Sequence, residues 1–167
     1  MEEIINRVAN SSLITIDLED YFPKEEIVLL DISQWLEQEI ILREKEFRQA
    51  LKEHNWELYK NCYVVLTNKK EAILPSWAYI LISTYLYSIA LKTIIGKEKE
   101  DMLNLLYLEI IANLPIENYT NQRLILKGCA KKPVPPNAYL FLMEKLQPIA
   151  KSIMYGEACS TVPLYKS

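Results

Sequence analysis

Two short loops carry the residues best suited to chemistry in this chain. They span residues 67–75 and 127–135, and each connects an apolar run to a proline. The side chains with binding capacity are Lys69 and Lys70 in the first loop, and Lys127, Gly128, Cys129, Lys131 and Lys132 in the second. Free backbone N–H groups and the dipole at a helix N-terminus favour anions, and nearby lysines add to that field. The loops therefore predict a small-anion site, with solvated surface lysines as the alternative.

Cys129 is the single residue in these loops with the clearest chemical setting. It follows Gly128, and three lysines lie within three positions of it. Positive charge stabilises a thiolate over a thiol, so the residue is a candidate metal ligand, persulfide carrier or nucleophile. The alternative is a small buried residue in a turn. Cys159 is a candidate second metal ligand if the fold brings the two together, whereas Cys62 begins an apolar run and is expected in the core.

The composition excludes several familiar classes of site. Three glycines form neither a G-x-G-x-x-G turn nor a Walker-type loop. The single histidine, His54, excludes zinc sites with two or more histidines, and we expect it at the surface near a helix end. A net charge of −3 argues against general nucleic-acid binding. An odd number of dispersed cysteines and the lack of a signal-peptide pattern indicate the cytoplasm.

The chain also aligns with itself at a shift of 60 residues. Residues 57–96 match 117–156 without a gap. The shared positions include Glu57/Glu117, Asn61/Asn121, Pro75/Pro135, Tyr79/Tyr139 and Gly96/Gly156. Prolines and glycines punctuate structure, so their equal placement favours a duplicated unit over a coincidence of pattern.

Each copy predicts a strand, a lysine-bearing loop and a helix of about 20 residues, because a proline opens the segment and a glycine closes it. We expect Gly96 and Gly156 to cap these helices and Pro148 to kink the second one. Residues 72–91 lack charge and have the length of a membrane span. The equivalent helix of the second copy has a charged face, so no membrane span is expected. The apolar face marked by Tyr85 and Leu91 is then covered by a neighbouring helix or by a second subunit, as in a homodimer.

The remaining elements complete an α/β layered domain with a mixed sheet of about four to five strands flanked by helices. We expect further strands at 13–16, 27–32 and 160–165, and helices at 43–53 and 101–113. These elements form one domain over 1–167. It comprises an N-terminal arm and strand (1–34), a first unit (35–96), a second unit (97–156) and a C-terminal strand (157–167).

Several segments together resemble the domain-of-unknown-function family 2480, small proteins of Bacteroidetes-type bacteria. They are residues 5–9, 18–23, 42–48, 73–79, 127–129 and 151–163, of which the last is the most specific. The family has no established activity, so the resemblance implies no catalytic residue. Its genes lie near sulfur-mobilisation and iron–sulfur assembly genes. The resemblance therefore implies an accessory role with protein partners in sulfur metabolism, and Cys129 and Cys159 as candidates to hold iron–sulfur or zinc.

Three hypotheses of function follow. The first is a cytosolic accessory factor in iron–sulfur or sulfur metabolism that uses Cys129 and Cys159. The second is a small-anion-binding module or enzyme that uses the two lysine-bearing loops. The third is a non-catalytic interaction domain that acts through the Tyr85/Leu91 helix face.

Titration of the accessible thiols against pH tests the interpretation of Cys129. The surrounding lysines should lower its thiol pKa below the ordinary value of about 8.5, so that its alkylation stays fast as the pH falls through neutrality. An ordinary thiol pKa, or no reaction in the native protein, would count against the hypothesis.

Overall fold

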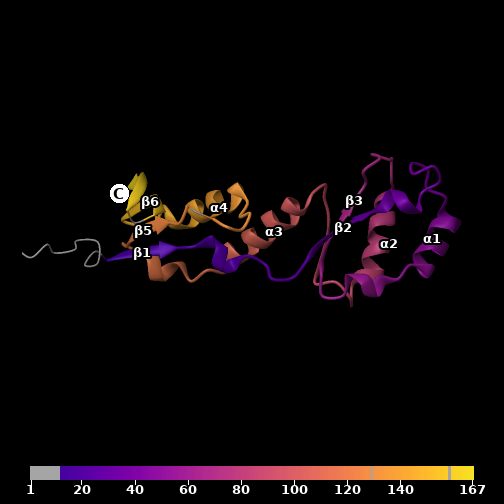
Figure 1. Cartoon of the computed structure of the whole chain (residues 1–167), viewed down its shortest axis with the longest axis horizontal. Helices are drawn as coiled ribbons and strands as arrows, with labels where there is room; N and C mark the ends of the chain where they lie inside the picture. Colours follow the sequence, from indigo (N-terminus) through magenta and orange to yellow (C-terminus); the bar gives the residue numbers. More distant parts are fainter. Residues whose placement is uncertain (1–11, 129, 158) are drawn as a thin grey trace, which may run out of the picture. The chain divides into compact units, whose positions relative to one another are not determined.

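The computed structural model describes residues 12–128, 130–157 and 159–167. The chain divides into two compact units (Figure 1). Pro23–Leu105 form one, here called the inserted unit, and the chain up to Phe22 joins Leu106–Ser167 in the other, here called the split unit. The sequence therefore leaves the split unit after its first strand and returns to it 83 residues later.

The inserted unit contains a parallel sheet whose strands lie in the order β2-β3-β4. The strands are β2 (Ile27–Asp31), β3 (Tyr63–Thr67) and β4 (Lys92–Ile95). The helices are α1 (Glu44–Glu53) and α2 (Ser76–Leu86), and the 3₁₀ turns are η2 (Ile32–Trp35) and η3 (Trp56–Tyr59). Parallel neighbours need a crossover, and α2 supplies it between β3 and β4.

The core of the inserted unit follows from helical and strand spacing. Phe47 and Leu51 lie four residues apart on α1, and both are completely buried. On α2 the buried positions are Ala78, Ile82 and Leu86, again at intervals of four. This spacing places each set on one face of its helix, and both sets pack in one cluster with β3.

The split unit contains a mixed sheet in the order β1-β5-β6-β7. Its strands are β1 (Leu13–Ile16), β5 (Arg123–Leu126), β6 (Ser152–Glu157) and β7 (Ser160–Lys166). The other elements are η1 (Leu18–Tyr21), α3 (Lys99–Ala112), η4 (Ile116–Tyr119) and α4 (Pro136–Leu146). β1, β5 and β6 are parallel, and β7 returns antiparallel to β6.

The two units have the same order of elements at the offset found in the sequence. Helices α2 and α4 begin and end 60 residues apart. Asn61 and Asn121 both have a positive φ, of 58° and 56°. Their N–H groups donate to the carbonyls of Ile89 (3.1 Å) and Ile149 (2.7 Å), which are also 60 residues apart. The origin of this correspondence in a duplication stays a prediction.

The α/β class and the mixed character of the sheet are confirmed, with the difference that two sheets share the strands. The helices of about 20 residues are wrong, because α2 and α4 end at Leu86 and Leu146 and the chain then forms β4 and β6. The β-branched run at 93–95 favours a strand. Pro148 lies beyond the end of α4 and does not kink it.

The two glycines expected as helix caps lie elsewhere. Gly96 follows β4, and Gly156 lies within β6 with a φ of 123°. Side chains rarely adopt this backbone conformation. In addition, a Cβ on Gly156 would lie 2.5 Å from the carbonyl oxygen of Ser160, at the hairpin between β6 and β7. Glycine is therefore required at this position by both conformation and space.

Every helix in the described ranges is too short or too polar to span a bilayer.

Substitution Gly156→Ala should lower the free energy of unfolding by about 1–3 kcal/mol, because it adds backbone strain and a close contact at the β6–β7 hairpin. Urea denaturation measures the change, with Lys166→Ala on exposed β7 as the control. An unchanged midpoint for Gly156→Ala would contradict this account of the hairpin.

Candidate functional site

A small cavity lies at the carboxyl end of β3 in the inserted unit. Its volume is about 170 Å³, and its lining residues are Thr67, Asn68, Lys69, Glu71 and Lys97. Thr67 ends β3, and Lys97 comes two residues after the end of β4. Because β3 and β4 are parallel, their carboxyl ends meet at one edge of the sheet and bring both lysines to the same cavity. Of these residues, the sequence analysis had identified only Lys69 as a candidate.

Thr67 has an unusual environment for a polar side chain. The residue is 2% exposed, and its Oγ1 makes no hydrogen bond with any described residue. A buried polar group without a partner costs about 1–3 kcal/mol. Thr67 thus places a hydrogen-bonding group without a protein partner beside a cavity that two lysines line.

Hydrogen bonds hold the backbone on both sides of this cavity. The Asn68 side chain donates to the Ala72 carbonyl (2.7 Å) and accepts from the Ala72 N–H (3.0 Å), which closes the loop after β3. On the other side, the Asp101 carboxylate accepts from the N–H groups of Lys97 (2.7 Å) and Glu98 (3.0 Å). The bonds from Glu98 and Lys97 lower the pKa of Asp101. The two loops are therefore fixed through their backbones.

The three lysines of these loops differ in their partners. The Lys70 ammonium forms an ion pair with Glu39 at 3.0 Å and does not line the cavity. Lys69 and Lys97 are exposed, and neither forms an ion pair with a described residue. The predicted pair Lys69 and Lys70 thus separates: Lys69 and Lys97 face the cavity, while Lys70 is occupied by Glu39.

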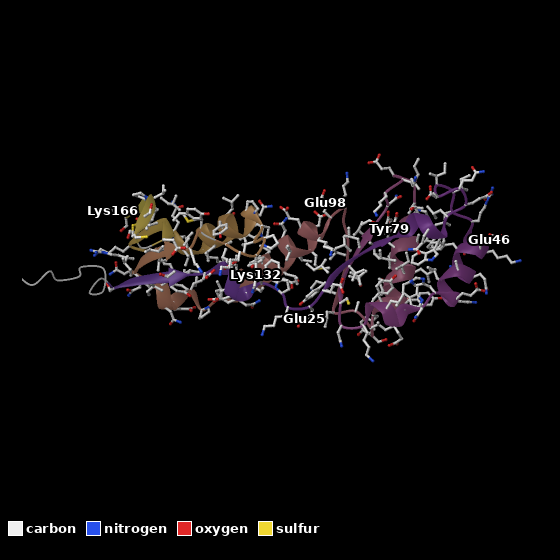
Figure 2. All side chains as sticks on the ribbon, in the orientation of Figure 1. Glu25, Glu46, Tyr79, Glu98, Lys132 and Lys166 are labelled. Carbon is white, nitrogen blue, oxygen red and sulfur yellow. The ribbon has the colours of Figure 1, made fainter. Side chains whose placement is uncertain are left out.

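The second predicted loop has a different arrangement. The Lys127 ammonium donates to the Asp17 carboxylate at 2.6 Å, and the bond lowers the pKa of Asp17 and raises that of Lys127. The Lys132 N–H donates to the Glu19 carboxylate at 2.5 Å, and its ammonium lies 5.8 Å from the centre of the Phe22 ring (Figure 2). Acidic groups from the β1–η1 segment thus occupy two of the predicted anion-binding groups.

Asp17 and Glu19 were not identified from the sequence, although one signal was available. Asp17 directly follows the strand predicted at 13–16, and Lys127 directly follows the strand at 123–126. Ile16 and Leu126 are opposite one another in the parallel register, so the next residues are adjacent. Gly128 lies in the same loop, where a Cβ would come within 2.8 Å of the Tyr155 ring, and Lys131 is exposed.

The cysteine hypothesis lies mostly outside the described residues. Cys129 is one of the residues outside them, so its relation to Cys159 stays a prediction. Cys159 is an exposed free cysteine, and Cys62, expected in the core, is only partly buried. Among the described residues, no group of three or more His, Cys, Asp or Glu side chains has an arrangement that could hold a metal ion.

Two further predicted surfaces are covered within the inserted unit. Tyr85 stacks on Trp56 with ring centres 5.0 Å apart, whereas Leu91 is 48% exposed. A homodimer through this face stays a prediction. His54 is partly buried against Trp35, Trp56 and Tyr59, not fully exposed as expected, and burial lowers its pKa.

A larger cavity of about 580 Å³ lies between η2 and α1, and Arg43 and Glu37 line it. Arg43 already donates to Glu37 at 2.5 Å. The lining also includes Glu46, so this cavity offers an anion less unpaired positive charge than the cavity beside Thr67.

Substitution Lys127→Met should raise the pKa of Asp17 toward its ordinary value of about 3.9, because the carboxylate loses its ammonium partner. A depressed pKa contributes stability above the unfolded-state pKa and loses it as the pH falls through the folded-state value. The variant should therefore lose less stability than the wild type on acidification. Carboxyl ¹³C NMR titration measures the pKa, with exposed Lys131→Met as the control; an unchanged Asp17 pKa in Lys127→Met would contradict the pairing.

Comparison with known proteins gives one match. The model of the family described as "Protein of unknown function (DUF2480)" matches residues 2–167, essentially the whole chain. No curated protein and no solved structure matches the chain. The resemblance read from the sequence is therefore confirmed, and the chain belongs to the DUF2480 family.

Proposed function

We propose that this protein binds a small oxyanion, or a small molecule carrying one, in the cavity lined by Thr67, Lys69 and Lys97. The observation that carries the proposal is the Thr67 hydroxyl, which is buried without a protein partner beside two lysines without acidic partners. A ligand oxygen that reached Thr67 would satisfy the hydroxyl, while the two ammonium groups would balance its charge.

The position of the cavity supports this function. Ligands of open α/β sheets usually bind outside the carboxyl ends of the strands. The cavity lies at that edge of the β2-β3-β4 sheet, because Thr67 ends β3 and Lys97 closely follows β4. Backbone hydrogen bonds fix both loops, so little ordering of the backbone would accompany binding.

Comparison with the split unit explains why we assign the ligand to the inserted unit. Lys127 lies 60 residues after Thr67, and its ammonium reaches Asp17 at the end of β1. The equivalent acid in the inserted unit, Asp31, instead accepts from the Ser33 N–H at 3.1 Å. Thr67 cannot form the ion pair that Lys127 forms. The charges at this edge are therefore paired internally in the split unit and available to a ligand in the inserted unit.

The size and lining of the cavity limit the class of ligand. Sites for drug-sized molecules have volumes of about 300–1,000 Å³. A cavity of about 170 Å³ is smaller and suits an anion or a small polar molecule. Glu71 also lines it, and its carboxylate can accept a hydrogen bond from a hydroxyl or amine. We therefore favour a small phosphorylated or sulfated compound with such a donor.

The alternative role in iron–sulfur or sulfur metabolism rests on Cys129 and Cys159 and stays a prediction. The described residues provide no geometry for it.

Calorimetric titration of the full chain with inorganic phosphate and with sulfate tests the proposed function. The double variant Lys69→Gln/Lys97→Gln should bind at least tenfold more weakly, because both cations are lost. The matched control is Lys70→Gln, which removes a neighbouring lysine that pairs with Glu39 and should change the affinity less than twofold.

Thr67→Val provides a second test that separates binding from folding. The variant should bind roughly tenfold more weakly, since a hydrogen bond to a charged group contributes about 1.5–3 kcal/mol. The free variant should be no less stable than the wild type, because it removes a buried hydroxyl without a partner. Equal affinity of wild type, double variant and Thr67→Val for both anions would refute the proposed site.

A further inference from the structure

The third parallel strands of the two units differ in what lies beside them. In the split unit, β6 pairs with β5 on one side and with antiparallel β7 on the other. In the inserted unit, β4 pairs with β3, and no described strand lies on its outer side. The first strands, β1 and β2, are both edges of their sheets, so the difference is confined to the β4 side.

The open side of β4 is apolar. Ile95 at its end is 62% exposed, as is Ile80 on the neighbouring helix α2. A cavity of about 280 Å³ lies along this edge, and its lining includes Tyr79, Thr93 and Ile94 (Figure 2 labels Tyr79). Surface of this kind on a strand edge invites pairing with another strand.

β4 also lacks the features that usually protect an edge strand. Proline, bulges and charged side chains block pairing at exposed edges. β7, the outer strand of the split unit, contains Pro163 and has a register shift opposite Ile153 and Met154. β4 has the sequence Lys-Thr-Ile-Ile, with no proline and an unbroken register with β3. The contrast indicates that the β4 edge is covered in the functional protein.

We propose that β4 pairs antiparallel with β4 of a second copy of this chain, which joins two inserted units into one continuous six-stranded sheet. The inference is independent of the anion site. β7 supplies its motive, because it shows that this chain covers the equivalent edge with an antiparallel strand. A second copy is the occupant that matches, since a twofold axis sets the same apolar edge against itself and closes the assembly.

The backbone directions agree with this pairing. The Leu91 N–H donates to the Cys62 carbonyl at 2.9 Å, toward β3. Backbone groups alternate in direction along a strand, so Lys92 and Ile94 direct theirs to the open side. A register centred on Ile94 sets Thr93 opposite Ile95 and keeps Lys92 away from its own copy. Like charges are therefore not opposed across the axis.

Sedimentation of the full chain over a concentration series tests the proposal. The wild type should form dimers, and Ile95→Lys should weaken self-association at least tenfold, because it places a charge on the pairing edge. Ile73→Lys is the matched control: it makes the same change at an isoleucine that is 99% exposed, in the loop before α2, and should leave the dimer intact. Circular dichroism checks that both variants fold.

Hydrogen exchange of the wild type provides the readout if Ile95→Lys fails to fold. The Ile94 amide should be protected at concentrations where the dimer forms and should lose that protection on dilution. A monomeric wild type, a dimer unaffected by Ile95→Lys, or an Ile94 amide that exchanges rapidly in the dimer would each overturn the proposal.

Discussion

The parallel pairing of one central strand on both of its sides is the constraint on which each unit depends. β3 is hydrogen-bonded to β2 and β4, and β5 to β1 and β6. This pairing buries Val64, Val65 and Leu66 and the equivalent Leu124, Ile125 and Leu126. It requires a helical crossover on each return of the chain, and it brings the carboxyl ends of all three strands to one edge. The fold thereby gathers Asp, Lys and Thr side chains at that edge.

The two units use this edge in different ways. In the split unit the charges are paired within the chain, Lys127 with Asp17 and the Lys132 amide with Glu19. In the inserted unit a threonine occupies the position of Lys127, and the lysines come from the loop after β3 and from the residues after β4. The same architecture thus supports an internally closed edge in one unit and an open, positively charged cavity in the other.

The sequence predicted the elements whose patterns are local and missed those that depend on tertiary pairing. Strands at 13–16 and 123–126 and the buried pair Phe47 and Leu51 follow from runs and spacing. β4 and β6 were read as helix, because aliphatic residues continue from α2 and α4 without an obvious break. Lys69 was found by composition, whereas Thr67, Lys97 and Asp17 become candidates only once the parallel register places strand ends side by side. A threonine in an apolar strand carries no signal of its missing partner.

The most direct measurement of the central claim is amide ¹H–¹⁵N NMR mapping of the full chain with inorganic phosphate. The account predicts saturable shifts at the amides of Asn68, Lys69 and Lys97, around the cavity beside Thr67. The equivalent amides of the split unit, from Lys127 to Lys132, should stay unchanged, because acidic partners already occupy that edge. Shifts confined to the split unit, or no saturable shift near Thr67, would contradict it.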